Sequence, residues 1–77
     1  MNDRIERKTP EIGEIVQVRV SGVSKRGDNA VGVVQNADYA GVVVFLPLEE
    51  AQNSGVMLKC QINALGKSVA FGTTVSN

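Results

Sequence analysis

The chain has 77 residues, of which 43% are hydrophobic and 21% are charged. For a chain of this length and composition we expect one globular domain with a small core, without room for a second domain and without disorder throughout. Eight lysines and arginines balance eight aspartates and glutamates, so the formal net charge is zero. Because phosphate neutralisation supplies most nonspecific affinity for nucleic acids, any nucleic-acid site on this chain must be a local patch of cations.

Residues with catalytic or metal-binding chemistry are scarce. There is no histidine, and the single cysteine, Cys60, lies in an alternating run typical of a small buried side chain. No acidic pair has the spacing of a metal site or an acid–base pair, so we expect no enzymatic activity, no cofactor and no metal. No apolar run approaches the ~20 residues that span a bilayer, and no signal peptide is recognisable. We therefore expect a cytoplasmic protein without membrane contact.

The N-terminal segment, residues 1–11, is polar and rich in charge. Pro10 disfavours a helical conformation at Thr9, so this segment is not predicted to begin a helix. We expect a flexible arm over residues 1–11, followed by a folded domain over residues 12–77.

The first predicted element of the domain is a half-buried strand over residues 15–20. Three valines alternate there with Gln17 and Arg19, so that one face of the strand is apolar and the other is polar. A turn follows, and it contains the adjacent cations Lys25 and Arg26.

Four further strands and one helical turn are predicted after these cations. The third strand is apolar on both faces, as expected where the outer side is covered or binds a flat ligand, and Pro47 ends it. The predicted strands cover residues 30–35, 41–46, 56–65 and 68–74, and the helical turn covers residues 48–54. The residues of the fourth strand that are predicted to share its apolar face are Leu58, Cys60, Ile62 and Ala64.

Five short strands with alternating apolar residues predict an all-β fold, a small five-stranded antiparallel barrel. Gly66 and Lys67 can supply a two-residue turn between its last two strands. Closure of the barrel removes the exposed edges that a small open sheet would carry.

Four motifs, EIGEIVQVRV, KRGDN, GVVVFLP and VAFGTT, occur here in the order found in TRAM domains. Residues 12–74 resemble this family of small RNA-binding barrels, which are related in shape to the OB-fold. TRAM domains are attached to enzymes that methylate or thiolate transfer RNA. They also occur as small stand-alone archaeal proteins that resemble bacterial cold-shock proteins in function. The resemblance implies an OB-fold-like barrel of the stand-alone type that binds RNA.

Four positions differ from the usual TRAM pattern, one of them Gly32, where a basic residue is frequent, and the loop from Val33 to Ala40 is longer than usual. Asn29 stands where the second glycine of a Gly-Asp-Gly turn is usual. We expect Asn29 to adopt the left-handed conformation of that glycine, which asparagine tolerates better than most residues. Val42 and Val69 stand where aromatic residues are common.

The candidate RNA-binding residues are cations and aromatic rings, because single strands are held by base stacking and phosphate neutralisation. These candidates are Arg19, Lys25, Arg26, Tyr39, Phe45, Lys59, Lys67 and Phe71. Other roles stay open for each of them. Phe45 and Phe71 could pack in the core, Tyr39 could be a lid on one end of the barrel, and the cations could be ordinary solvated charges.

The expected function is low-specificity binding of single-stranded RNA or transfer RNA by an RNA chaperone similar to cold-shock proteins. The alternative is a protein-interaction barrel that docks on a ribosome or an RNA-modifying complex through the apolar run from Val42 to Leu46. Salt separates the two functions, because RNA binding falls steeply with salt and an apolar protein contact does not.

Overall fold

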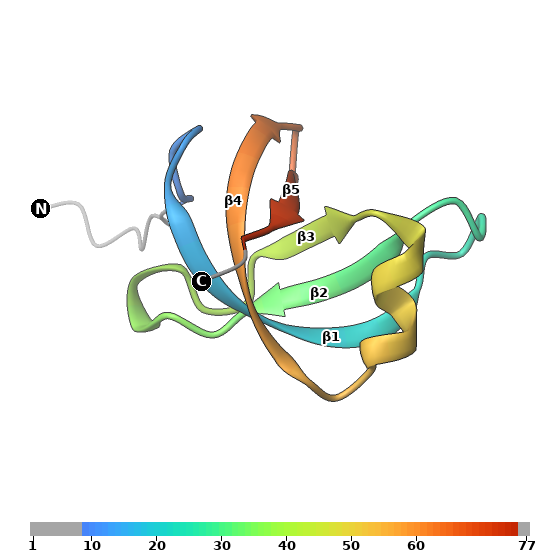
Figure 1. The fold of residues 1–77 in the computed structure, drawn as a ribbon. Helices are drawn as coiled ribbons and strands as arrows, with labels where there is room; N and C mark the ends of the chain where they lie inside the picture. The colour runs from blue at the N-terminus through green and yellow to red at the C-terminus, as the bar shows by residue number, and fades with distance from the viewer. Residues whose placement is uncertain (1–8, 76–77) are drawn as a thin grey trace, which may run out of the picture.

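The computed structural model describes residues 9–75, which form five strands and two short 3-10 helices (Figure 1). The strands are β1 (Ile15–Val23), β2 (Ala30–Val34), β3 (Val43–Leu46), β4 (Met57–Leu65) and β5 (Val69–Thr74), and the helices are η1 (Ala37–Tyr39) and η2 (Leu48–Asn53). All five strands expected from the alternation are present, and the expected helical turn is η2. β1 extends beyond its predicted end at Val20, and η1 has no counterpart in the sequence-based prediction.

The strands close into a barrel in the order β1-β2-β3-β5-β4, which confirms the predicted all-β, five-stranded barrel. Four neighbouring pairs are antiparallel, whereas β3 and β5 pair in parallel. The expectation that every pair is antiparallel needs this one correction. Strand direction can alternate all the way around a closed ring only if the number of strands is even, so a ring of five contains at least one parallel pair.

Aliphatic side chains on the inner faces of the strands form the core. Cys60 is fully buried, as predicted, and this burial, together with the nearby Glu50 carboxylate, raises the pKa of its thiol to about 11. No aromatic residue of the described segment 9–75 is fully buried, so the two phenylalanines lie outside the core. The buried hydrophobic residues are Val16, Val18, Val20, Ala30, Val34, Val42, Val44, Leu46, Cys60, Ile62 and Ala70.

Two β-bulges interrupt the regular register of the barrel. In β1 the register shifts between Val20 and Gly22, and Gly22 has a φ of +145°, in the region that favours glycine. In β4 the register shifts between Ile62 and Ala64. Because a bulge places two residues opposite one, it reverses the inside–outside alternation of the strand. Ala64 is therefore exposed, and its predicted place on the inner face is wrong.

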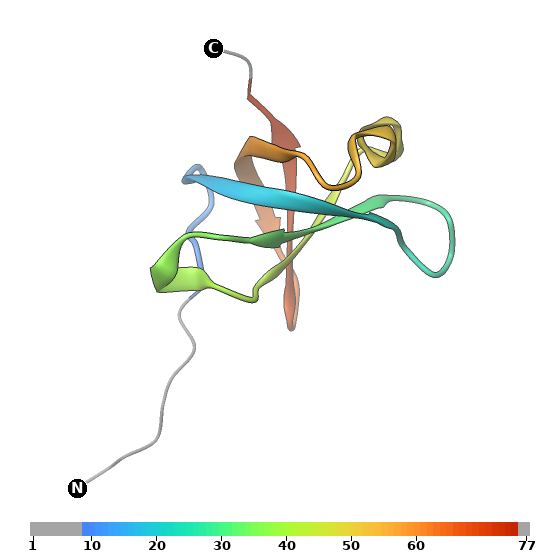
Figure 2. The ribbon, with the colours of Figure 1, turned by 90° about the horizontal axis from the view of Figure 1, so that it is seen from below.

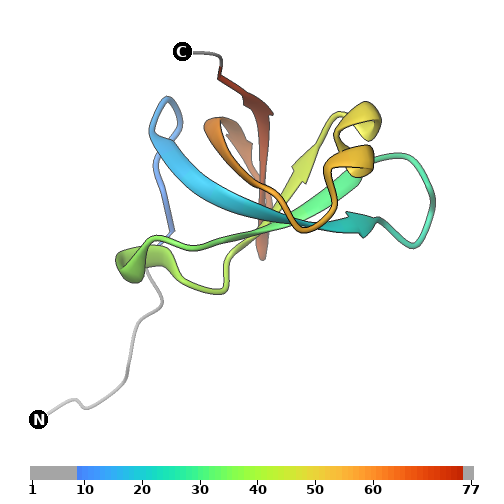
Figure 3. The same cartoon turned by 60° about the horizontal axis from the view of Figure 1, so that its bottom comes forward.

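η1 and η2 lie on opposite sides of the molecule, and the β1–β2 turn projects on the η2 side (Figures 2 and 3). Tyr39 of η1 and Ala51 of η2 both pack against the core. Thr74 Oγ1 donates a hydrogen bond of 3.0 Å to Glu50 Oε2, which links η2 to the end of β5.

Of the predicted N-terminal arm, residues 1–8 lie outside the described part of the chain. Pro10 is fully buried, and the backbone N–H of Gly13 donates to the carbonyl oxygen of Ile62 at 2.7 Å. The packed structure therefore includes Pro10, which precedes the domain start expected at residue 12.

Candidate nucleic-acid interface

The outer surface of β2, of β3 and of β5 as far as Phe71 is apolar, as is the inner surface of these strands. We call this surface the apolar face, and its outward side chains are Val31, Val33, Val43, Phe45, Val69 and Phe71. The register aligns Val31, Phe45 and Phe71 in one row across the three strands, and the other three valines in the next row. All six side chains are partly exposed, so apolar atoms from three strands form one continuous surface.

Phe45 and Phe71 form an aromatic pair at the centre of this face. Their ring centroids are 5.5 Å apart and the ring planes are inclined at 50°, within the range of favourable aromatic contacts. Phe45 is half-buried and Phe71 is 39% exposed. Of the two roles left open by the sequence, core packing is excluded for both rings by their place on the outer surface.

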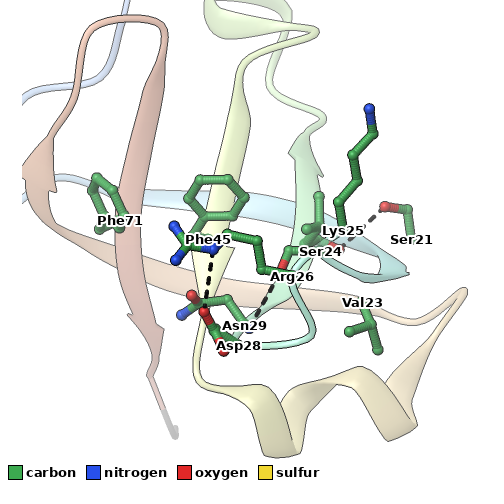
Figure 4. A pocket seen from close by; sticks show the side chains of 10 residues that line it. Ser21, Val23, Ser24, Lys25, Arg26, Asp28, Asn29, Phe45 and Phe71 are labelled. Atoms are coloured by element: carbon green, nitrogen blue, oxygen red, sulfur yellow. Dashed lines mark hydrogen bonds and ion pairs between the residues drawn. The ribbon is translucent and has the colours of Figure 1, made fainter.

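A hollow of about 730 Å³ opens where the apolar face meets the β1–β2 turn (Figure 4). Phe45 and Phe71 line it together with Lys25 and Arg26, so four of the candidate residues meet at one place. They come from three segments that are distant in the sequence. The other residues that line the hollow are Ser21, Val23, Ser24, Asp28, Asn29 and Val31.

The β1–β2 turn is held by hydrogen bonds that leave its cations free to face the solvent. The backbone N–H of Ser24 donates to the carbonyl oxygen of Asn29 at 2.8 Å, and that of Gly27 donates to the carbonyl oxygen of Ser24 at 2.9 Å. Gly27 has a φ of +78°, so it provides the left-handed residue of the turn. Lys25 and Arg26, between Ser24 and Gly27, are both exposed.

The predicted left-handed conformation of Asn29 is wrong, because no residue other than glycine has a positive φ within residues 9–75. Asn29 acts through its side chain instead. Its Nδ2 donates to the carbonyl oxygen of Leu46 at 3.2 Å, and its backbone N–H donates to Ser24 Oγ at 3.3 Å. These bonds fix the turn to the end of β3, next to the two rings.

One acidic residue accompanies the cations of the hollow. Arg26 Nε lies 3.7 Å from Asp28 Oδ2, and the two side chains are 88% and 66% exposed. An ion pair this exposed contributes little to stability and is screened by salt. The hollow therefore combines two cations with one anion, and Asp28 competes with any phosphate for Arg26.

The other three candidate cations lie away from this hollow. Lys67 lines a second hollow of about 320 Å³, which is also lined by Val42 and Val69, the two valines at positions where the TRAM resemblance implies aromatic rings. Arg19 and Lys59 lie on the outer surface of β1 and β4. The structure therefore does not gather all the predicted cations into one patch.

Tyr39 lines neither hollow. It is half-buried against the core, and its hydroxyl donates a hydrogen bond of 2.7 Å to Glu14 Oε2. A hydrogen bond from the Glu11 backbone N–H and this one from Tyr39 both lower the pKa of the Glu14 carboxyl. The geometry matches the lid role that the sequence left open for Tyr39.

Sequence reasoning missed Val31 and Asp28 as residues of the hollow. The signal for Val31 was available, because β2 and β5, like β3, have apolar residues at successive positions. Three such strands side by side predict an apolar outer surface. No sequence pattern predicts that Asp28 lines the hollow, because its distance to Arg26 depends on the conformation of the turn.

The arrangement is suited to bind a flat apolar ring beside an anionic group, since exposed aromatic surface and cations line the same hollow. Among the described residues, no group of three or more histidine, cysteine or acidic side chains could hold a metal ion. Neither short helix of residues 9–75 has the length or apolar character needed to cross a membrane.

The fold and the hollow thus define a small five-stranded β-barrel with one apolar outer face next to a cationic turn. No known protein-family profile and no curated protein sequence matches the chain. The function is therefore inferred from the geometry of the hollow and from the motifs of the sequence.

Proposed function

We propose that this protein binds single-stranded or weakly structured RNA at the hollow beside the β1–β2 turn, as a low-specificity RNA chaperone of the TRAM type. The observation that supports this function is the meeting of Lys25 and Arg26 with Phe45 and Phe71. All four residues also belong to the motifs that resemble the TRAM family. Transfer RNA is a candidate ligand through its unpaired segments.

In the proposed mechanism, an unpaired base stacks on the exposed ring of Phe71 while its phosphates approach Lys25 and Arg26. Stacking on an aromatic side chain contributes ~1 to 3 kcal/mol per base, and the bases of a duplex are not accessible for it. The protein therefore binds the open form of an RNA hairpin more tightly than the closed form. Binding shifts the hairpin toward its open form, which is the action of an RNA chaperone.

Low sequence specificity follows because polar side chains of the hollow form hydrogen bonds within the protein. Ser21 Oγ donates to the carbonyl oxygen of Val31 at 3.2 Å, and Asn29 Nδ2 donates to Leu46. Ser24 Oγ accepts a hydrogen bond from the Asn29 backbone. Because these groups hold the turn, they have less capacity to recognise the edge of a base, and the faces of all four bases can stack.

The test is a fluorescence anisotropy titration with a short unstructured RNA and with a duplex of equal length, over a series of salt concentrations. We expect tighter binding of the single strand. The two phosphates at the β1–β2 turn should contribute about −1 to −1.5 to the slope of log affinity against log salt, since each neutralised phosphate of a single strand contributes ~0.7. The proposal is wrong if the protein does not bind the RNA at low salt, or binds the duplex equally well.

A second candidate function is docking on a protein of a ribosome or an RNA-modifying complex. The observation that favours it is the apolar face itself, because six valine and phenylalanine side chains are at least partly exposed on it. The formal net charge of zero is also compatible with a protein partner. A stable complex whose affinity is insensitive to salt would support this candidate in place of RNA binding.

A further inference from the structure

A second cationic turn lies at the far end of the apolar face from the β1–β2 turn. β5 begins at Val69, shortly after Lys67, and β3 runs parallel to β5. β2 is antiparallel to β3 and begins at Ala30, which pairs with Leu46 at the C-terminal end of β3. The β1–β2 turn and the β4–β5 turn are therefore at opposite ends of the apolar face, along the direction of the strands.

The two hollows are neighbours on this face. Phe71 lines the first and Val69 lines the second, and these outward residues of β5 are about 7 Å apart at ~3.3 Å per residue. Gly66, in the turn with Lys67, lies close to both side chains. A Cβ atom placed on Gly66 would be 3.1 Å from Val69 Cγ2 and 3.3 Å from Phe71 Cε1.

The charges along this path favour an anionic strand. Among residues 9–75, the second hollow is lined by one cation, Lys67, and by no carboxylate. Within the described strands, the outward side chains of the apolar face between the two turns are valines and phenylalanines. A path across the strands toward β1 would instead meet Arg19. This residue pairs with Val33 of the apolar face, but its Nη1 donates to the carbonyl oxygen of Gly55 at 3.1 Å, on the β4 side of β1.

We infer that the RNA strand lies along β3 and β5, from the β1–β2 turn to Lys67, and that the second hollow is a second nucleotide subsite. This inference rests on the proposed RNA-binding function and adds the direction and the length of the bound strand. Lys25 and Arg26 neutralise phosphates at one end of the path, and Lys67 neutralises a phosphate at the other end. The apolar face between them contacts the bases.

The span between the two turns sets the length of RNA that reaches both. Lys67 lies four residues before Phe71 in the chain. The row of the sheet in which Ala30 pairs with Leu46 is one residue further along the strands than the row of Phe71, and the β1–β2 turn lies beyond that row. Five residue steps at ~3.3 Å give about 17 Å. A stacked strand advances ~3.4 Å per nucleotide, so about five nucleotides cover the path.

The experiment compares the parent protein with Lys67→Ala and with Lys59→Ala, a matched control that removes one exposed lysine from the outer surface of β4. Each protein is titrated with oligouridylates of two, three, five and eight nucleotides at several salt concentrations. Circular dichroism melting confirms that the variants are folded. We expect Lys67→Ala to weaken binding of the five- and eight-nucleotide RNAs several-fold and to make their salt slope shallower by about 0.7.

The shorter oligonucleotides should bind Lys67→Ala and the parent alike, because they do not reach from the β1–β2 turn to the second hollow. Lys59→Ala should bind every length as the parent does. Equal affinity and salt slope of Lys67→Ala and the parent with eight nucleotides would overturn the inference while leaving RNA binding intact. A Lys59→Ala effect as large as that of Lys67→Ala would also overturn it. A parent protein that binds no oligonucleotide at low salt would contradict the proposed function itself.

Discussion

The apolar face is flanked by the cations Lys25, Arg26 and Lys67, and the outer surface of β1 and β4 carries Arg19 and Lys59, but the two surfaces differ in what surrounds these cations. Among the outward residues of β1 and β4, each apolar residue pairs with a polar one across the two strands: Ile15 with Gln61, and Met57 with Arg19. On β2, β3 and β5, apolar residues pair with one another in continuous rows. A cation count alone therefore does not identify a nucleic-acid site. The proposed function requires cations beside a continuous apolar surface, because a single strand presents both phosphates and bases.

The largest expected effect comes from removing the rings. The double variant Phe45→Ala/Phe71→Ala should bind unstructured RNA about tenfold more weakly or worse, since each lost stack is worth ~1 to 3 kcal/mol. The matched control is Ile15→Ala/Met57→Ala, which removes two exposed apolar side chains from the other surface. Anisotropy titrations of both folded variants measure the difference. Equal losses in the two variants would remove the distinction between the surfaces.

Removing the cations should give the next largest effect. Lys25→Ala/Arg26→Ala should bind RNA several-fold more weakly, with a salt slope shallower by about 1 to 1.5, because two phosphates are no longer neutralised. Arg19→Ala/Lys59→Ala removes the same charge from the β1–β4 surface and should leave the slope near that of the parent. If the two double variants have the same slope, Lys25 and Arg26 do not make the phosphate contacts assigned to them.

Removing the anion of the hollow should strengthen binding. Asp28→Asn keeps the size of the side chain and releases Arg26 from its 3.7 Å ion pair. Exposed pairs of this kind are weak, so we expect an affinity gain of up to about fivefold at low salt, which disappears at high salt. The same titrations measure it. Weaker binding of Asp28→Asn would mean that Asp28 contacts the RNA directly.

The smallest expected effect concerns Tyr39, which lies outside both hollows. Tyr39→Phe should leave RNA affinity unchanged and lower the melting temperature slightly at neutral pH, because the hydrogen bond to Glu14 is lost. The folded state lowers the pKa of Glu14, so this stabilisation is present above the carboxyl's unfolded-state pKa and is lost as the pH falls through its folded-state pKa. The melting temperatures of the variant and the parent should therefore converge in acid. A loss of RNA affinity in Tyr39→Phe would place this residue in the interface.

The strands and the core could be predicted from the sequence, because alternation of apolar residues directly encodes which side chains face inward. The buried valines of β1 and the buried Cys60 follow from this rule. Ala64 does not, because a β-bulge reverses the alternation and has no residue signature in this strand. A closed ring of five strands needs at least one parallel pair, and here that pair is β3–β5. Composition and periodicity do not show which strands pair in parallel.

The candidate site could be predicted only in part. The two rings and the adjacent cations were found from residue type and motif, but their convergence depends on the register that places Phe45 beside Phe71. The conformation of the β1–β2 turn was not predicted, because Gly27 and Asn29 are both residues that adopt a left-handed conformation. Gly27 is the residue with the left-handed conformation, and Asn29 instead donates a hydrogen bond to Leu46. This hydrogen bond exists only in the folded barrel.

The most direct test of the central claim is a nuclear magnetic resonance titration of the labelled protein with a short unstructured RNA. The account predicts that the backbone amide signals with the largest shifts belong to residues 23–31, 43–46 and 66–71, which form the two turns and the apolar face between them. Residues 15–19 and 57–61 on the β1–β4 surface should shift little. Largest shifts on the β1–β4 surface, or no shifts at low salt, would contradict it.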